Sequence, residues 1–551
     1  MSDEVLRIEA APVPDTATEH LVPMRDGTRL ATDVYLPPGG EPTEAVLVRL
    51  PYDKDSRYVF FDKVAALFIA RGYAVVVQDV RGKFRSEGAT VGFLGEAADG
   101  YDTIEWVIRQ PWSNGVVGMF GDSYYGFTQW AAVSAAHPAL KAIVPRVTSA
   151  ELGADLPESS CTDVPWMVHA DYLSHYWVDH DVYEYEQDYS LRPLTEIFER
   201  AFRLVGGRSA FYDLTVPEYR VGELHPFGHP FDAPAVPVLH VVGWFDNLLI
   251  PSMRDYETLS RRPDWAENQY LSADSVDHEN YHLSLAPIAD ADDHLLDDAA
   301  LARMLELYAT PALEFFDVFL KRRASRDSLP KVAWHLGHVG YRTSSSWPPP
   351  EARQDSLHLS GLRGAATGSG VLGSDPSSEE DDVATWTHDP SDLVPSSVPN
   401  SFAFLHDHPD ERELLRRGDV IGFSTDPQTT PLDLAGPVDL QVTVTSTAPS
   451  TDVFAKLLDV HPDGSANMIL RGQATLHEAR TAAPATISLG HTGYRVREGH
   501  RLVLAVFSSD FPEFVPHPGK GDNRWTATET VTSTQTLHPG ATLTFWHLPG
   551  D

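Results

Sequence analysis

The sequence contains a single cysteine, Cys161, in 551 residues. One cysteine cannot form an intramolecular disulfide, which excludes a small scaffold held together by cross-links. No other side chain of a metal-ligating type flanks it at a useful spacing, so we expect an isolated thiol at this position.

Long apolar runs are also missing. No stretch approaches the roughly 18 consecutive apolar residues that suggest a membrane-spanning helix. The N-terminal segment MSDEVLRIEAAPVPDT carries acidic residues early and lacks the apolar core of a signal peptide. We therefore expect a cytoplasmic protein without a membrane partner.

Positive charge is scarce, because 42 Lys and Arg stand against 79 Asp and Glu, for a formal net charge of -37. Such an excess repels nucleic acid and anionic lipid, so we expect neither as a partner. The sequence offers no recognisable motif for a cofactor or a metal, and we expect none. A small molecule is the expected partner, and the composition leaves homo-oligomer formation open.

The first 150 residues are rich in continuous apolar runs that are separated by amphipathic segments. The runs predict buried strands, and the segments between them predict helices. The predicted strands are 45–52, 73–82, 115–121 and 141–147, and the predicted helices are 61–72 and 96–110. Strands rich in Val and Ile that alternate with helices indicate a parallel sheet covered on both faces.

The pattern changes after residue 150. Residues 151–232 are crowded with aromatic and charged side chains, and LTEIFERAFRLVG within them has helical spacing. Buried-strand runs return at 237–246 and 268–275, and a helix is expected at 309–324. This order predicts a helical layer inserted into the α/β domain.

Beyond residue 330, short alternating or apolar runs such as VDLQVTVTSTA and HRLVLAVFSSD lie between Gly, Pro, Asp and Ser turns. This texture is typical of an all-β sandwich or jelly roll. The expected chain is therefore an α/β domain (1–150 and 233–330), a helical cap (151–232) and a C-terminal β domain (331–551).

Ser123 lies where the apolar run VVGMFG ends and a helical pattern begins. A serine on such a tight turn is the nucleophile elbow of α/β-hydrolases, with the pattern G-x-S-x-G. Gly121 matches the first glycine, but position 125 is Tyr125 and the next glycine is Gly126. A serine that caps the following helix is the simpler alternative.

The form G-x-S-Y-x-G resembles the cocaine esterase-like hydrolases, relatives of the X-prolyl dipeptidyl-peptidases and α-amino acid ester hydrolases. Several further segments look like that family, in order along the chain: VPMRDGTRLATDVYLP, VRLPYDK, GYAVVVQDVRGKFRSEG, WSNGVVGMFGDSYYGFTQWAAV, VVGWFDN and TDVFAKLLDVHPDG. The resemblance implies an α/β-hydrolase domain, a helical cap and a C-terminal jelly roll. These match the three textures above.

A serine needs a base and an acid, which follow it in that chain order in α/β-hydrolases. Asp246 ends the apolar run PVLHVVGWFD, and the resemblance makes it the acid. The segment VDHENYH offers His278 and His282, of which His278 matches the family's base. Because these histidines are four residues apart, a metal pair on a helix is an alternative reading, but it lacks a clear third ligand.

The oxyanion that forms during acyl transfer needs hydrogen-bond donors. The backbone N–H of Tyr124 is one candidate. By itself, a tyrosine at a strand end such as Tyr52 more often packs than takes part in catalysis, but the resemblance makes its hydroxyl the second donor. In the expected cap, Trp166, Tyr172 and Tyr176 are candidates for the substrate pocket, and ordinary helix packing is the alternative for each.

These residues predict a serine hydrolase that cleaves a carboxylic ester through a Ser–His–Asp acyl-enzyme mechanism. Asn247, Leu248 and Leu249 after the acid cannot hold an ammonium group, which favours an uncharged acyl part. An amidase or dipeptidyl-peptidase is the second reading. An inert protein that binds carbohydrate or another ligand is the third.

Overall fold

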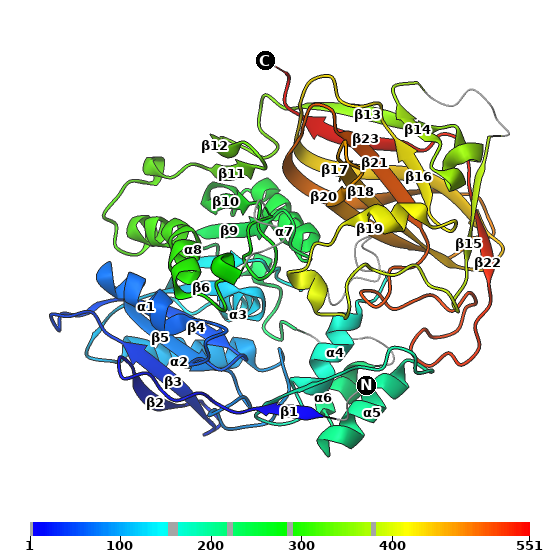
Figure 1. Ribbon diagram of the computed structural model, residues 1–551. Helices are drawn as coiled ribbons and strands as arrows, with labels where there is room; N and C mark the ends of the chain where they lie inside the picture. The colour runs from blue at the N-terminus through cyan, green and yellow to red at the C-terminus, as the bar shows by residue number, and fades with distance from the viewer. Residues whose placement is uncertain (1–3, 153–163, 217–223, 284–289, 376–381, 551) are drawn as a thin grey trace.

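A computed structural model describes residues 4–152, 164–216, 224–283, 290–375 and 382–550. In Figure 1 the α/β part occupies one side in blue, cyan and green, and the β-rich C-terminal part occupies the other in yellow to red. Cys161 and the segments 153–163 and 217–223 of the expected cap lie outside the described residues.

Ten described strands form one mixed sheet, whose middle seven are parallel. The order across the sheet is β12 (Gly340–Ser344), β11 (Val332–Leu336), β10 (Gln269–Asp274), β9 (Val238–Gly243), β7 (Leu140–Arg146), β6 (Ser113–Asp122), β4 (Thr43–Leu50), β5 (Ala74–Asp79), β3 (Arg29–Tyr35) and β2 (Thr18–Pro23). The antiparallel strands β2, β3 and β12 lie at the two edges.

Helices cover both faces of this sheet, as the apolar runs predict. Along β4, Val46 and Val48 pack into the core shared with α1 (Phe61–Ala70) and α8 (Asp298–Phe319), while Ala45 and Leu47 pack into the core on the opposite face. The second core is shared with α2 (Glu96–Ile108), α3 (Ser123–Ser134) and α7 (Leu249–Arg261). Successive strand side chains point to opposite faces, so a strand buried on both sides reads as a continuous apolar run.

The expected domain boundary at residue 330 does not coincide with the boundary between the two sheets. The run at 331–337 is a strand, β11, but it pairs in parallel with β10, and β12 then pairs with β11. Both therefore extend the α/β sheet, while Val332, Trp334 and Leu336 of β11 pack into the core of the C-terminal domain. The sequence pattern of an apolar strand does not show which sheet the strand joins, because tertiary contacts decide the pairing.

The segment expected as a helical cap contains α4 (Met167–His175), α5 (Thr195–Val205) and α6 (Ala210–Thr215). It also contains a short strand, β8 (Val182–Tyr185), which pairs with β1 (Val5–Ile8) near the N-terminus. Lys83 anchors the cap to the α/β part, because its buried ammonium donates to the backbone carbonyls of Tyr176, Asp179 and Asp181.

Eleven described strands form the β-rich C-terminal part. Their order is β15 (Ala384–His388), β22 (Ser533–Leu537), β17 (Leu432–Ser446), β23 (Thr542–His547), β13 (Arg353–Ser360), β14 (Gly370–Gly373), β16 (Ile421–Ser424), β21 (Arg501–Phe507), β18 (Thr451–Val460) and β19 (Ala466–Leu476), with β20 (Pro484–Val496) paired to β17. The predicted fold class is confirmed: an α/β-hydrolase domain with inserted helices and a C-terminal jelly-roll domain.

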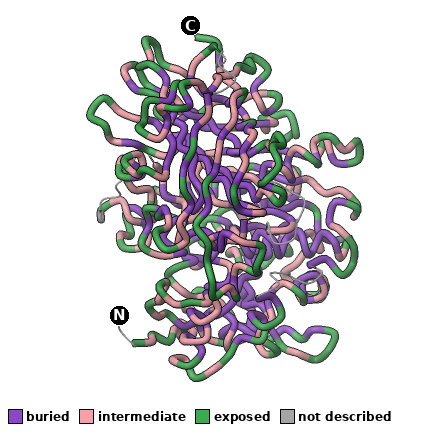
Figure 2. The backbone as a smooth tube through the Cα atoms, turned by 90° about the vertical axis from the view of Figure 1, so that its right-hand side faces the viewer, coloured by how far each residue is buried: buried purple, intermediate pink, exposed green. Residues whose placement is uncertain are grey.

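The core runs without interruption between the two large parts, since Trp244 and Met253 of the α/β domain pack into the apolar core of the C-terminal domain. Figure 2 shows the buried residues concentrated in the interior and the exposed residues at the periphery. Within the described ranges, no helix combines the length and apolar character needed to cross a bilayer.

Candidate active site

Ser123 lies at the sharp turn between β6 and α3, in a backbone conformation that non-glycine residues rarely adopt, with φ at 49°. Such strain is concentrated at functional sites. Two glycines make the turn possible: a Cβ at Gly121 would lie 2.0 Å from the Tyr125 ring, and one at Gly126 would lie 2.3 Å from Thr148. The second glycine is therefore needed at 126, where the helix passes Thr148.

Asp246, His278 and Ser123 form a continuous chain of hydrogen bonds. The Asp246 Oδ1 atom lies 2.7 Å from His278 Nδ1, and His278 Nε2 lies 3.0 Å from Ser123 Oγ. Asp246 follows β9, His278 follows β10, and Ser123 follows β6, so all three come from the carboxyl ends of parallel strands. The structure thus brings together the three residues that the sequence predicts as acid, base and nucleophile.

The loop that carries His278 is held by a buried carboxylate that the sequence did not single out. Asp277 Oδ1 accepts hydrogen bonds from the backbone N–H groups of Glu279 and Tyr281. Its other oxygen lies 3.2 Å from Nε2 of His408, which belongs to the C-terminal part of the chain. The backbone N–H of His278 itself donates to the carbonyl of Leu405. Residues far along the chain therefore position the candidate base.

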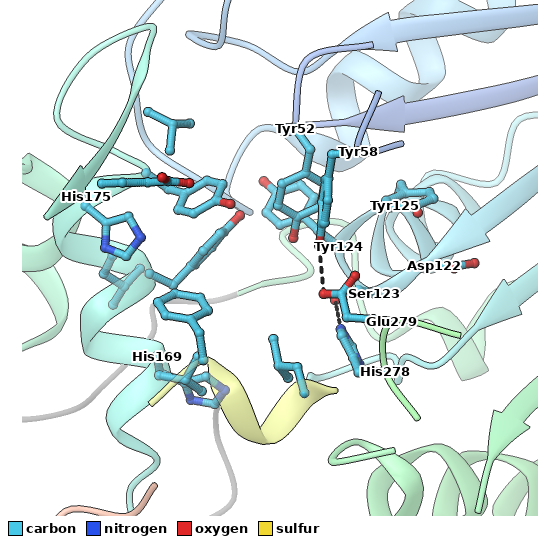
Figure 3. Close-up of a pocket in the computed structure, with 18 of the residues that line it drawn as sticks. Tyr52, Tyr58, Asp122, Ser123, Tyr124, Tyr125, His169, His175, His278 and Glu279 are labelled. Carbon is cyan, nitrogen blue, oxygen red and sulfur yellow. Dashed lines mark hydrogen bonds between the residues drawn. The ribbon is translucent and has the colours of Figure 1, made fainter. Parts of the chain in front are cut away.

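The predicted oxyanion donors both lie beside Ser123. The Tyr52 hydroxyl contacts the side chain of Ser123, and Figure 3 shows Ser123 between Tyr52 and His278. The hydroxyl of Tyr124 donates to Glu96 and accepts from the backbone N–H of Phe93. Its side chain is thus occupied, and the backbone N–H is the group that Tyr124 has to offer a substrate.

Ser123 opens into a cavity of about 650 Å³, a size typical of small-molecule sites. Tyr52, Tyr58, Tyr172 and Tyr176 form an aromatic cluster on its wall, with ring centroids 4.7 to 6.4 Å apart between neighbours. The C-terminal part closes the cavity with Asn400, Phe402, Leu405 and His406. Two of the predicted pocket residues, Tyr172 and Tyr176, therefore line this cavity.

The expectation that Trp166 lines the substrate pocket needs a correction, because this residue does not line the cavity at Ser123. Its ring packs on Phe514 and Phe404 of the C-terminal part, with centroids 4.2 and 5.2 Å away. It precedes α4, on which Tyr172 lies, and its position before the first helical turn directs it toward the β domain instead. The surface of the C-terminal domain, which the sequence does not reveal, decides the orientation of the Trp166 ring.

Opposing influences act on the pKa of His278. Burial lowers it, while the charge and hydrogen bond of Asp246, with a contribution from Glu279, raise it to a net value of about 9. For the acid Glu279, burial acts in the opposite direction and raises the pKa above its ordinary value. The Glu279 carboxylate lines the cavity and accepts a hydrogen bond of 2.8 Å from the hydroxyl of Tyr58.

Glu279 and Tyr58 are cavity residues that the sequence reasoning missed. Glu279 directly follows the candidate base, and that adjacency was the one available signal. The alternative base, His282, lies elsewhere: its Nε2 atom is 3.5 Å from Asp274 Oδ1 and its ring is stacked edge-on against His335. His278 and His282 therefore face different partners and do not form a metal pair with each other.

Two family models match the chain. One, described as X-Pro dipeptidyl-peptidase (S15 family), matches residues 26–183, and another, described as the X-Pro dipeptidyl-peptidase C-terminal non-catalytic domain, matches residues 324–544. The cocaine esterase of Rhodococcus sp. (strain MB1 Bresler) is 30% identical over 95% of this chain and 96% of its own length. A putative serine esterase of Mycobacterium bovis is 23% identical over 90% of this chain and 91% of its own.

Solved structures share the fold across nearly the whole chain. An α-amino acid ester hydrolase matches with a TM-score of 0.77 and 23% identity, over 97% of this chain and 96% of its own. An aminopeptidase from the marine sediment archaeon Thaumarchaeota archaeon matches with a TM-score of 0.77 and 22% identity, over 98% and 99%. At these identities the similarity establishes the architecture.

Proposed function

Because the chain belongs to the X-Pro dipeptidyl-peptidase (S15) family of serine hydrolases, we propose that it cleaves a carboxylic ester through an acyl-enzyme formed on Ser123. The observation that carries this proposal is the chain of hydrogen bonds from Asp246 through His278 to Ser123, with distances of 2.7 and 3.0 Å. It ends at a strained nucleophile on the wall of a cavity of small-molecule size.

In the proposed first step, Ser123 Oγ attacks the ester carbonyl carbon while His278 Nε2 takes the hydroxyl proton. Asp246 stabilises the imidazolium that forms and orients the ring through Nδ1. His278 then gives the proton to the leaving alkoxide, and the alcohol departs. Water attacks the acyl-enzyme with His278 again as base, which releases the acid and restores the serine.

Negative charge on the carbonyl oxygen is stabilised in this mechanism by two donors, the Tyr52 hydroxyl and the Tyr124 backbone N–H. The contact between the Tyr52 hydroxyl and the Ser123 side chain supports this role. A donor of this kind contributes about 10²–10³-fold to the rate, because the oxyanion exists in the transition state and the ground-state carbonyl is a weaker acceptor.

An ester with an aromatic or other apolar acyl or alcohol part fits the wall built by Tyr172, Tyr176 and Leu248. A second candidate, a substrate with a free ammonium group such as an aminoacyl ester or peptide, is favoured by the Glu279 carboxylate on the same wall. The apolar side chains of Leu248 and Leu249 after Asp246 disfavour a substrate with an ammonium group, whereas the carboxylate of Glu279 favours one. Experiment therefore has to distinguish the two candidate substrates.

Two measurements test the proposal. A fluorophosphonate probe should label the wild-type protein and fail to label Ser123→Ala, while Ser56→Ala, in the same cavity with its hydroxyl bonded to the Tyr52 carbonyl, should still be labelled. An inert binding protein would show no labelling at all. The second measurement compares kcat/KM for neutral aryl esters with that for aminoacyl-proline amides, in the wild type and in Glu279→Gln. A preference for the amides that Glu279→Gln removes would establish the second candidate.

A further inference from the structure

His282, the histidine that does not contact Ser123, belongs to a second cluster of polar side chains. Asp274 ends β10, His282 lies just beyond the loop that carries His278, and His335 lies on β11. The Oδ1 atom of Asp274 lies 3.5 Å from His282 Nε2 and 4.0 Å from His335 Nδ1, and the three ligand atoms lie within 4.8 Å of one another.

We propose that Asp274, His282 and His335 form a binding site for a divalent transition metal of the Zn²⁺ type. Two imidazoles and one carboxylate are ligands that suit zinc and its neighbours rather than calcium or magnesium. In a tetrahedral zinc site with bonds of about 2.0–2.1 Å, neighbouring ligand atoms lie roughly 3.3 Å apart. The two distances from Asp274 Oδ1 must shorten by less than about 1 Å to reach that spacing, and the distance between the two imidazole nitrogens, which is at most 4.8 Å, by up to about 1.5 Å. This site departs from the expectation that the chain holds no metal.

Hydrogen bonds from neighbouring groups hold the Asp274 carboxylate of the cluster in place. The Tyr341 hydroxyl donates to Asp274 Oδ2 at 2.7 Å, and the backbone N–H of Ser275 donates to Oδ1 at 2.7 Å, so the carboxylate is oriented from both sides. Outer contacts of this kind fix the ligands of metal sites. The Ser275 hydroxyl lies 2.7 Å from His335 Nδ1, so a metal that binds through this nitrogen would replace that hydrogen bond.

The three side chains are only partly buried, so an ion from solution can reach them. The side chains of Asp274, His282 and His335 are 21%, 22% and 11% exposed, so they combine partial desolvation with access. By contrast, the acidic cluster of Glu19, Asp33 and Asp55 is filled by the ammonium of Lys54, whose Nζ lies 2.7 to 3.0 Å from all three carboxylates. That cluster has no need of a cation from solution.

The position of the site gives it a role in the fold. Asp274 and His282 flank the loop with His278, and an isolated β-bridge between Val276 and His282 already draws the ends of this loop together. A metal bound there ties both ends of the loop to β11, a strand inside the sheet. The ion would therefore restrain the loop that presents the candidate base, without contact to Ser123.

The test uses the full-length chain without a polyhistidine tag, stripped of metal with a chelator and titrated with Zn²⁺ against a chromophoric competitor. We expect stoichiometric uptake by the wild type that His282→Gln and His335→Gln each abolish. The matched control is His461→Gln, from the cluster of Asp459, His461 and His500 in the C-terminal domain, and it should leave this uptake intact. Absence of uptake by the wild type, or its loss in His461→Gln alone, would overturn the proposal.

A second readout keeps the test independent of folding defects in the variants. Zn²⁺ should slow amide hydrogen exchange in residues 275–283 of the wild type and leave that of His282→Gln unchanged. Co²⁺ should give visible d–d absorption bands in the wild type that weaken in His282→Gln. Equal exchange with and without Zn²⁺ in the wild type contradicts the proposed restraint of the loop.

Discussion

The Asn280 side chain donates a hydrogen bond of 3.0 Å from Nδ2 to Asp122 Oδ2, and this bond joins the loop of His278 to the residue before Ser123. Arg146 completes the link, since it donates to Asp122 Oδ1 at 2.8 Å and to Asn280 Oδ1 at 2.9 Å. The candidate base and nucleophile are thus held relative to each other by a second set of contacts, separate from their own hydrogen bond.

We expect Asn280→Ala to lower kcat/KM by about tenfold or more, because small displacements of reacting groups are costly in rate. Asn280 has φ at 66°, a conformation that asparagine tolerates better than alanine. Asn280→Gly is the control, because it accepts this φ but also lacks both hydrogen bonds. If Asn280→Gly recovers wild-type kinetics, backbone strain is responsible and the positioning role is wrong.

Tyr52→Phe should lower kcat by about 10²-fold or more with little change in KM, because the lost hydrogen bond strengthens in the transition state. Tyr58→Phe is a matched control: its ring lies 5.9 Å from that of Tyr52, but its hydroxyl bonds Glu279. Steady-state kinetics on one neutral aryl ester compares the two. A similar, few-fold effect of both substitutions would assign Tyr52 a packing role.

The pH dependence follows from the net rise of the His278 pKa to about 9, against an ordinary value of 6.5. A base must be neutral to accept a proton, so kcat/KM should fall about tenfold per pH unit below the pKa and level off above it. The acid limb should therefore lie above pH 6.5. Asp246→Asn and Glu279→Gln each remove a negative charge and should move the limb to lower pH, with the larger shift for Asp246→Asn. A limb that stays in place in Asp246→Asn would contradict the assignment of the base.

His278→Ala should abolish turnover, whereas His282→Ala should retain kcat/KM within a few-fold in metal-free buffer. The reason is geometric, since His278 Nε2 reaches Ser123 Oγ and His282 faces Asp274. Burst kinetics with a p-nitrophenyl ester would measure both variants under the same conditions. Loss of the burst in His282→Ala with a normal melting temperature would reverse the assignment.

Trp166→Ala should destabilise the protein, by up to about 3 kcal/mol, because a large ring leaves its contacts with Phe404 and Phe514. The same variant should keep KM for a small ester, since Trp166 lies outside the cavity. Tyr176→Ala gives the comparison, because this residue lines the cavity and should change KM. Thermal unfolding and steady-state kinetics on both variants separate the two roles. An altered KM in Trp166→Ala alone would return that residue to the substrate pocket.

The sequence by itself determined the features that depend on local patterning. Continuous apolar runs marked β4, β5, β6 and β7, because a strand buried on both faces needs apolar side chains at every position. The turn at Ser123 was readable because its glycines are the residues that a positive φ and close approach require. Chain order and the resemblance then indicated Asp246 and His278.

Only the tertiary structure decided which distant segments meet. Strand pairing assigned β11 to the α/β sheet, and the surface of the C-terminal domain drew Trp166 away from the cavity. The same domain supplies His408 to the loop of His278 and Phe402 to the cavity wall. Packing also separated His278 from His282 and placed the latter beside Asp274 and His335. Contacts across hundreds of residues leave no periodic trace in a sequence, because they are set by shape and burial after the elements have formed.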